Sequence, residues 1–493
     1  MGTPLIWLCL TLATFAFIRY FFNRSCCKLP GPSFLTVALN FQHLGTVHHP
    51  KLLLRWSKKY GDIFQYSVLG NRFVVFNTPE TIKSCCSSDD RQNYPHGGAF
   101  HVYTHGDYGI TGSKYKDWSE QRKLVVRSLR KFGFRGDEKS SQSLGQDVDR
   151  IISDLAMACN KPLNLEEWLQ LPMMNMVWRM TVSSTLPEDR FPLLLRFQTL
   201  FGRSLRSSIL LIFGPVFAFL KWELDFVKEY KRSVEGLRDI QKKKIDEHLE
   251  RHDEGSDPND FLDEYLTKMK QEGSKGSSFE GATGMKNLLA TLMDVNIAGS
   301  ATAYHTLEYI VLHLLLNQKI QDKVREEVEV AVGKDGKVTL EDTSRLPYTE
   351  ACIMEMIRDF AAAPIVVKVS DKDSTVEGHF IPAGTYLISN LWGSNHRDDL
   401  WEEPFVLKPE RFLDETGKHL VNTEKVMSFG AGRRKCLGYP VAKDMLILLI
   451  SNIVQRFKIL PHPEHKIATL ETRMSIFQQA PEFTALIIDR FGK

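Results

Sequence analysis

The chain has 493 residues, of which 43% are hydrophobic and 25% are charged. This is ordinary usage for a folded protein, so wholesale disorder and collagen-like structure are excluded. The formal net charge is only +3, which gives no reason to expect a nucleic-acid partner.

The eight cysteines form no recognisable framework. None belongs to a CxxC pair, and the adjacent pairs Cys26–Cys27 and Cys85–Cys86 are too close for ordinary disulfides within themselves. A zinc site and a secreted disulfide scaffold are therefore not indicated, and a reducing compartment is favoured.

The chain begins with an apolar segment. Pro4 to Ile18 carries no charge, and counting on to Phe22 gives 19 residues, close to the ~20 that span a bilayer, with Arg19 able to reach the interface. A cleaved signal peptide is the alternative, but neither a basic n-region nor a small-x-small cleavage site is obvious. We expect residues 1–22 to be an uncleaved anchor, with the rest on the cytoplasmic side because the basic residues follow the apolar run.

Residues 23–35 are basic and proline-rich, and Pro30-Gly31-Pro32 cannot continue a helix, so this segment is predicted to be a stiff hinge. No later linker divides the chain, so residues 36–493 are predicted to form one domain. Ile209–Leu220 is apolar but too short to cross a bilayer; it is either a pair of core helices or a patch that dips into the membrane.

Strand signals come first in the body of the chain. Residues 62–76 predict a β-hairpin with its turn at Leu69-Gly70-Asn71. Thr78-Pro79 predicts the start of a helix, with Thr78 as the N-cap. Strand-like runs return only at 364–390, with Gly384 as a turn.

Helical patterns dominate between these strand regions. The long periodic segments with few breakers are 115–131, 145–160, 223–252 and 285–316. Residues 252–283 are polar and end in a Gly/Ser-rich stretch, which predicts a mobile surface connection. The fold class is therefore mainly α with small β-sheets.

Residues 429–438 read Phe-Gly-Ala-Gly-Arg-Arg-Lys-Cys-Leu-Gly. A thiolate that ligates haem iron must stay deprotonated, be shielded from water and accept backbone hydrogen bonds. Gly432 and Gly438 would let the backbone bend closely around the sulfur of Cys436. A helix that begins near Pro440 would direct its positive end at the thiolate, and Arg434 can pair with a haem propionate.

This segment resembles the haem-binding signature of cytochromes P-450, F-x-x-G-x-R-x-C-x-G, at all five fixed positions: Phe429, Gly432, Arg434, Cys436 and Gly438. A chance match in a chain of this length is on the order of 10⁻⁴. The resemblance implies the P-450 fold, with a long central helix over a buried haem b, and Cys436 as the axial ligand of the iron.

Further matches follow the family's order along the chain. Glu355 and Arg358 match E-x-x-R, and Arg411 lies in a P-E-R-F segment, which implies a buried Glu–Arg–Arg network that fixes the fold. Trp118 and Arg122 match W-x-x-x-R, whose side chains contact haem propionates. Lys368 is carried over as a propionate contact, with a surface lysine on a strand edge as the alternative.

The long helical segment 285–316 contains Ala298-Gly299-Ser300-Ala301-Thr302-Ala303, which resembles A-G-x-[D/E]-T-[T/S]. The resemblance makes Thr302 the catalytic hydroxyl that organises proton delivery during oxygen activation. Small residues at 298 and 299 would let the helix pass close over a haem face. Ala301 stands where the family has an acid, and Ala303 where it has Thr or Ser, which puts the proton supply in doubt.

One face of segment 115–131 is basic, because Lys or Arg recurs at 123, 127, 130 and 131. Such faces are usually only solvated; near a haem this one would suit docking of an acidic flavin reductase. By family analogy the substrate pocket is lined by apolar residues, which are Phe100, Phe213, Ile297, Ile365 and Phe477.

The sequence therefore predicts a monooxygenase of the endoplasmic reticulum membrane that inserts one oxygen atom from O₂ into a lipophilic substrate such as a steroid, fatty acid or xenobiotic. The resemblance implies NADPH as the electron source through a separate reductase, with cytochrome b5 as a possible second partner; no dinucleotide fingerprint is present in this chain. A reductase-independent isomerase or dehydratase of lipid peroxides and a non-catalytic haem binder are the alternatives.

Overall fold

A computed structural model describes residues 29–492, except 69, 89–90, 92, 96–97, 207–223, 252–256, 274–275, 465–470 and 475–476. The predicted anchor (1–22) and the apolar segment Ile209–Leu220 lie outside these residues. Within them, no helix combines the length and apolar character needed to cross a membrane.

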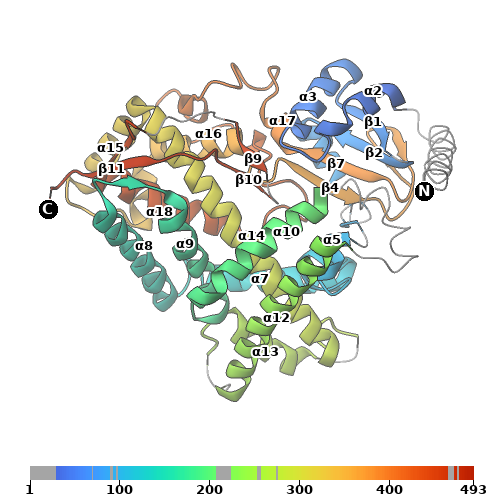
Figure 1. Cartoon of the computed structure of the whole chain (residues 1–493), viewed down its shortest axis with the longest axis horizontal. Coiled ribbons are helices and arrows are strands. Elements are labelled where there is room, and N and C mark those ends of the chain that lie inside the picture. The colour runs from blue at the N-terminus through green and yellow to red at the C-terminus, as the bar shows by residue number, and fades with distance from the viewer. Residues whose placement is uncertain are drawn as a thin grey trace, which may run out of the picture.

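Helices make up most of the molecule, which confirms the predicted fold class (Figure 1). The α-helices of the described residues are α2 (Phe34–Leu39), α3 (His49–Tyr60), α4 (Pro79–Cys85), α5 (Gly98–Tyr103), α6 (Gly109–Gly112), α7 (Tyr115–Lys131), α8 (Glu138–Ala158), α9 (Leu165–Val182), α10 (Phe191–Arg206), α12 (Asp225–Arg251), α13 (Phe261–Glu272), α14 (Gly281–Leu316), α15 (Gln318–Val332), α16 (Pro347–Phe360), α17 (Leu391–Asn395) and α18 (Tyr439–Arg456).

Short strands form four small sheets in the described part of the chain. They are β1 (Ile63–Val68), β2 (Asn71–Phe76), β3 (Pro162–Leu163), β4 (Ile365–Val369), β5 (Ser374–Val376), β6 (His379–Ile381), β7 (Tyr386–Asn390), β8 (Phe457–Pro461), β9 (Arg473–Met474), β10 (Gln478–Gln479) and β11 (Ala485–Asp489). The largest sheet has the order β1-β2-β7-β4, with β2 and β7 parallel and the other pairs antiparallel. The β1–β2 pair is the predicted hairpin, and Gly70 at its turn has φ +75°.

Helix α14 runs diagonally through the middle of the molecule (Figure 1). Its 36 residues correspond to a length of about 54 Å. Nearly every residue between Asn287 and Leu315 is buried, because other helices cover the helix on several sides; its most extensive packing is against α9. A helix that is apolar all round can be stable only in such a buried position.

Two sequence predictions about helices need correction. The predicted connection 252–283 contains α13, whose Phe261, Leu262 and Tyr265 are buried in the main core. Helix α8 begins at Glu138 rather than at 145, because Asp137 caps it by accepting a hydrogen bond from the Ser140 N–H at 2.8 Å. In both segments polar residues interrupt the apolar periodicity from which helices were predicted, so the sequence did not indicate these helical residues.

The predicted hinge is described from Leu29 onward, and there it lies against β1. The Pro30 carbonyl accepts a hydrogen bond from the Gln65 N–H at 2.9 Å, and a side chain at Gly31 would collide with the Gln65 carbonyl oxygen. The backbone of Pro30 and Gly31 is therefore fixed to the edge of the largest sheet.

The predicted Glu–Arg–Arg network is present and buried. Arg358 donates two hydrogen bonds to the Glu355 carboxylate, at 2.7 and 3.0 Å, and Arg411 donates one at 3.1 Å. Arg358 also donates to the carbonyls of Asn395 and Pro404, at 2.6 and 3.0 Å. The network therefore joins α16 to the long irregular segment that precedes Cys436.

Candidate functional site

The loop that carries Cys436 is closed by its own backbone. The Cys436 N–H donates to the Phe429 carbonyl at 2.9 Å. Helix α18 begins at Tyr439, which confirms the helix start predicted near Pro440, and Gly438 is its N-cap. Cys436 is accessible to solvent, although protein atoms surround its sulfur closely enough to desolvate it in part. Burial raises the pKa of the Cys436 thiol, whereas the N–H groups of Gly438 and Tyr439 and the charge of Arg122 oppose that rise. The loop thus supplies the hydrogen bonds and positive charge that a thiolate needs.

The glycines of this loop serve two different purposes. Gly432 has φ +69°, and a Cβ there would lie 2.3 Å from the Cys86 carbonyl oxygen, so both the conformation and the close approach require glycine. Gly438 has φ −84°, which any residue can adopt. A Cβ at Gly438 would lie 4.0 Å from the Cys436 sulfur. The sequence interpretation of Gly438 as a point of backbone freedom was therefore wrong.

Gly430 provides a matched control for Gly432, because it also has φ +69° but a Cβ there would meet nothing within 4 Å. We expect Gly430→Ala to cost about 1–2 kcal/mol of stability through left-handed strain alone. Gly432→Ala adds a backbone collision, worth roughly another 1–3 kcal/mol, and should displace the Cys436 loop. Haem content per folded protein, measured on both variants, checks this; equal content in the two would contradict the role assigned to Gly432.

Trp118, Arg122 and Arg434 meet beside the Cys436 loop. The Arg434 guanidinium lies 4.6 Å from the centre of the Trp118 ring and donates to the carbonyls of Ile110 and Ser113 at 3.1 and 2.7 Å. Arg122, one helix turn after Trp118 on α7, donates to the Lys435 carbonyl at 2.7 Å. Two neighbouring residues of α7 are therefore brought together with Arg434, which lies more than 300 residues later in the chain.

Lys368 is buried on β4, which rules out the surface lysine that the sequence left as an alternative. Its ammonium group lies 3.1 Å from the centre of the Tyr94 ring. Burial, together with the nearby charge of Arg434, holds the pKa of Lys368 well below its usual value. Charging Lys368 in this buried position is therefore costly unless an anion lies near it.

These side chains fit a haem. The indole Nε1 of Trp118 is buried and, within the described part of the chain, has no hydrogen-bond partner. A propionate of the cofactor would supply an acceptor for this N–H and a counter-charge for Arg434 and Lys368. An accessible cysteine sulfur in the adjacent loop provides an iron ligand of the expected kind.

Helix α14 is buried along most of its length but is accessible around the small residues at 298 and 299. Ala298 is exposed and Thr302 is partly exposed, whereas Ala301 and Ala303 are buried. The Thr302 hydroxyl donates to the Ala298 carbonyl at 2.6 Å, so its oxygen remains free to accept a further hydrogen bond. The predicted role of Gly299 needs correction, because a Cβ there would lie 3.1 Å from Val177 of α9. Its small size serves helix packing.

Sequence reasoning missed Asp294, a buried carboxylate on α14. It accepts hydrogen bonds from the Tyr103 hydroxyl at 2.8 Å and from the Ile110 and Thr111 N–H groups at 2.7 and 2.9 Å. Burial raises its pKa. Because Arg434 binds the Ile110 carbonyl, the short helix α6 joins α14 to the Cys436 loop. An isolated acid in a long apolar helix was the signal that could have identified it.

The residues predicted to line the pocket do not all face one space. Phe100 contacts Tyr103 and Phe201 in an aromatic cluster, and Ile297 is buried in the main core. Ile365 packs with Trp56 and Phe64 on the far side of the sheet, whereas Val366 packs with Cys86 and Ala431, so the prediction for Ile365 was wrong. Phe477 is partly exposed, and Phe213 lies outside the described residues.

The basic face of α7 is only partly available. Arg127 pairs with the buried carboxylate of Glu264 on α13, and Lys131 donates to the Pro258 carbonyl at 3.4 Å. Lys123 and Arg130 are exposed. Arg127 therefore has a structural role in addition to any role in docking.

Comparisons with known proteins agree with this geometry. The family model for Cytochrome P450 matches residues 29–487. Cytochrome P450 2D27 of Mesocricetus auratus is 28% identical over 445 residues, covering 87% of this chain and 86% of that protein. The farnesoate epoxidase of Bombyx mori is 24% identical over 465 residues, covering 91% of this chain and 92% of that protein.

A zebra fish cytochrome P450, solved with abiraterone, superposes with a TM-score of 0.76 at 22% sequence identity. The superposition covers 90% of this chain and 99% of that one. At this identity the likeness establishes the fold.

Proposed function

The chain belongs to the cytochrome P450 family and is a haem-thiolate monooxygenase, and on this premise we propose that it oxidises a lipophilic substrate with electrons from NADPH, delivered by a separate flavin reductase. The observation that carries the proposal is the meeting of Trp118, Arg122 and Arg434 beside the accessible sulfur of Cys436.

In this proposal Cys436 is the iron ligand, and Trp118, Arg122, Arg434 and Lys368 hold the propionates. The bound haem supplies the redox chemistry of oxygen activation. The N–H groups of Gly438 and Tyr439 help to keep the thiolate ionised. The propionates are neutralised by Arg122 and Arg434, and a propionate beside the buried Lys368 favours its charged form.

A lipophilic substrate is supported by an aromatic cluster contributed by α5, α10 and α12. Phe100 and Tyr103 pack against Phe197, Phe201 and Tyr230, with ring centres 5.2 to 6.4 Å apart. The Asp294–Tyr103 hydrogen bond ties this cluster to α14. One relative is named for its action on farnesoate, a lipophilic carboxylate.

The proposed function is tested with purified holoenzyme, NADPH, a flavin reductase and a panel of lipophilic compounds under oxygen-18. Incorporation of one labelled atom per product supports the monooxygenase. Turnover of a lipid peroxide without reductase, and without label from O₂, would instead select the isomerase or dehydratase. A haem-loaded protein that turns over neither class of substrate would select the non-catalytic haem binder.

Thr302 is proposed to guide protons, and its removal tests this. We expect Thr302→Ala to lower product formation by about a hundredfold, at the lower end of what general acid–base groups contribute, and to increase peroxide release per NADPH. Thr302→Ser should retain most of the activity. Thr306→Ala is the control, because the Thr306 hydroxyl makes the same bond to the carbonyl four residues earlier, at 2.7 Å. Equal coupling in Thr302→Ala and the native enzyme would remove Thr302 from the mechanism.

The reductase is proposed to dock on the exposed basic residues of α7. Reversing the charge at Lys123 should slow reduction several-fold at low salt, with the difference shrinking as ionic strength rises. Lys123 is preferable to Arg127, whose loss would also break the contact with Glu264. Stopped-flow reduction of Lys123→Glu is compared with that of Lys161→Glu, an exposed lysine outside α7. Identical reduction rates would contradict docking at α7.

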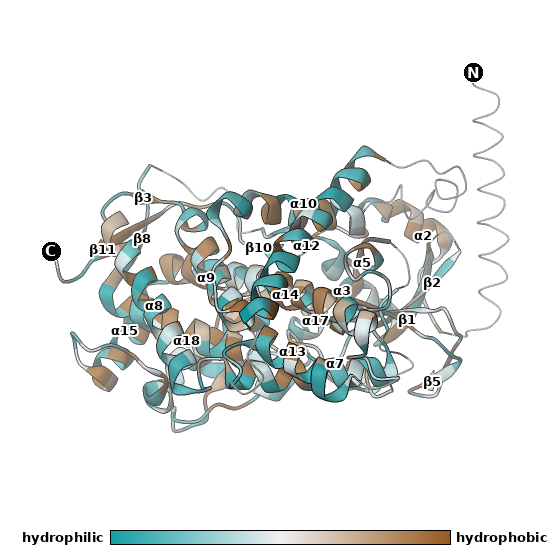
Figure 2. Cartoon of the chain, turned by 90° about the horizontal axis from the view of Figure 1, so that it is seen from below, coloured by the Kyte–Doolittle hydropathy of each residue, from teal (hydrophilic) through white to brown (hydrophobic). Residues whose placement is uncertain are grey.

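Attachment to the endoplasmic reticulum membrane through residues 1–22 is also proposed. Helix α2 is the first described helix after this segment, and it carries exposed apolar side chains. Phe34, Leu35 and Leu39 are 54%, 66% and 71% exposed. Figure 2 shows the hydrophobic character of this helix. Deletion of residues 1–22 should move the expressed protein from the membrane fraction toward the soluble one, and α2 would account for any residual peripheral binding.

A further inference from the structure

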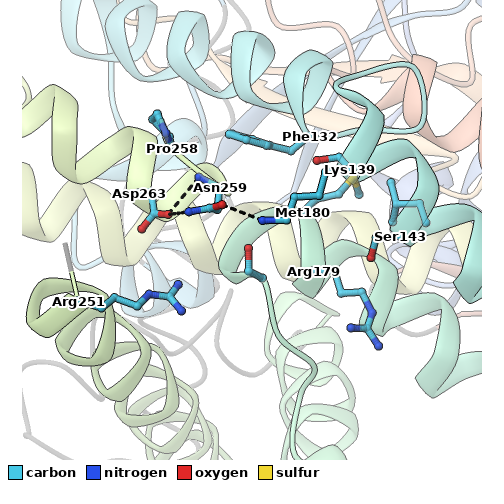
Figure 3. A pocket seen from close by; sticks show the side chains of 12 residues that line it. Phe132, Lys139, Ser143, Arg179, Met180, Arg251, Pro258, Asn259 and Asp263 are labelled. Atoms are coloured by element: carbon cyan, nitrogen blue, oxygen red, sulfur yellow. Dashed lines mark hydrogen bonds between the residues drawn. The ribbon is translucent and has the colours of Figure 1, made fainter. Parts of the chain in front are cut away.

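A second candidate binding site lies in a pocket of about 440 Å³ between α8, α9, α13 and the end of α12. None of its lining residues belongs to the Cys436 site. Figure 3 shows Lys139, Arg179 and Arg251 arranged around it, with Phe132 at one end of its wall. The volume falls within the range of ~300–1,000 Å³ that is typical of small-molecule sites.

The cations of this pocket come from three different helices and are incompletely neutralised. Lys139, in the first turn of α8, donates to the neutral amide oxygen of Asn259 at 2.8 Å. Arg179, near the end of α9, shares Asp147 with Arg150, at 2.9 and 3.0 Å.

The third cation, Arg251, is the last residue of α12. It lies 3.7 Å from the carboxylate of Asp260, which also contacts His248 at 2.9 Å. The one carboxylate of the lining, Asp263, accepts the Asn259 N–H at 3.1 Å.

These pairings leave a positive excess. The lining contains three cations, Lys139, Arg179 and Arg251, and one carboxylate, Asp263. Their ion-pair partners outside the lining add one cation and two carboxylates, which are Arg150, Asp147 and Asp260, so four cations stand against three carboxylates. The planar guanidinium groups of arginine match phosphate oxygens with two parallel hydrogen bonds. The hydroxyls of Ser140 and Ser143 are additional donors in the lining.

The lining also holds apolar side chains, which are Phe132, Leu144, Met180 and Pro258, beside the polar Ser183 and Asn259. A ligand with an anionic head and a compact organic body would meet both kinds of side chain. We propose that this pocket binds an organic phosphate, whose oxyanion is held by Lys139, Arg179 and Arg251 and whose organic part packs against Phe132 and Met180.

The test titrates the holoenzyme with 1-naphthyl phosphate as the probe. Isothermal titration calorimetry measures the affinity and the number of sites per chain. Inorganic phosphate and 1-naphthol, the two halves of the probe, are titrated separately. The variants are Lys139→Glu, which reverses a charge of the lining, and Ser143→Trp, which fills the pocket from the partly exposed face of α8. Lys334→Glu, the same change at an exposed site outside the pocket, is the control.

We expect one site per chain for 1-naphthyl phosphate, with affinity reduced about tenfold or more in Lys139→Glu and in Ser143→Trp but unchanged in Lys334→Glu. Any binding of 1-naphthol should be the same in Lys139→Glu as in the native protein, since it lacks the charged head. No saturable binding, or equal affinities in Lys139→Glu and Lys334→Glu, would overturn the proposal. Inorganic phosphate binding as tightly as the probe would overturn the organic part of it.

Discussion

Replacing Cys436 by serine is expected to abolish the red-shifted Soret band of the ferrous carbon monoxide complex and to reduce product formation to background. The physical reason is that a serine hydroxyl does not ionise at neutral pH, even with the N–H groups of Gly438 and Tyr439 directed at it. The measurement is the difference spectrum of protein that is folded by circular dichroism.

Cys159→Ser is the matched control, because Cys159 is also partly accessible but lies at the end of α8. That variant should keep both the spectrum and the activity. Retention of the native spectrum in Cys436→Ser would refute Cys436 as the ligand, and loss of the spectrum in both variants would mean that the assay reports general instability.

Replacing Glu355 by glutamine is expected to destabilise the fold by about 3–5 kcal/mol. The substitution removes the charge that pairs with Arg358 and Arg411 but keeps the size of the side chain, so two buried guanidinium groups lose their counter-ion. The Lys408 N–H, which donates to the same carboxylate at 2.9 Å, is also affected. A lower midpoint of urea-induced unfolding and poor retention of haem are the expected readouts.

Lys323→Gln is the control for this charge loss. Lys323 and Glu410 form an exposed pair at 2.9 Å in the same part of the molecule, with side chains 56% and 55% exposed. Such surface pairs are worth about 0–1 kcal/mol. If Glu355→Gln were no more destabilising than Lys323→Gln, the network would not be the structural support of the Cys436 region that we describe.

The sequence alone was sufficient wherever the determinants are local. The β1–β2 hairpin depends on a glycine turn, α7 on periodic apolar residues, and α14 on a long, mostly apolar run with few breakers. The Cys436 loop depends on the spacing of glycines around one cysteine. Glu355 and Arg358 lie three residues apart on one helix, so their contact follows from helix geometry.

Tertiary structure decided the questions that depend on which neighbour a residue meets. Residues 365–369 read Ile-Val-Val-Lys-Val, a run without alternation, so nothing in it specifies which face of the sheet Ile365 occupies; the packing partners on the two sides do. In the same way Gly299 is small because Val177 lies against it, and Lys368 is buried because Tyr94 covers it. The sequence by itself determined the local backbone of this protein and the residue types at the haem-binding motif. Which side chains are buried and which charges pair was decided by contacts between segments far apart in the chain, because no local pattern encodes those contacts.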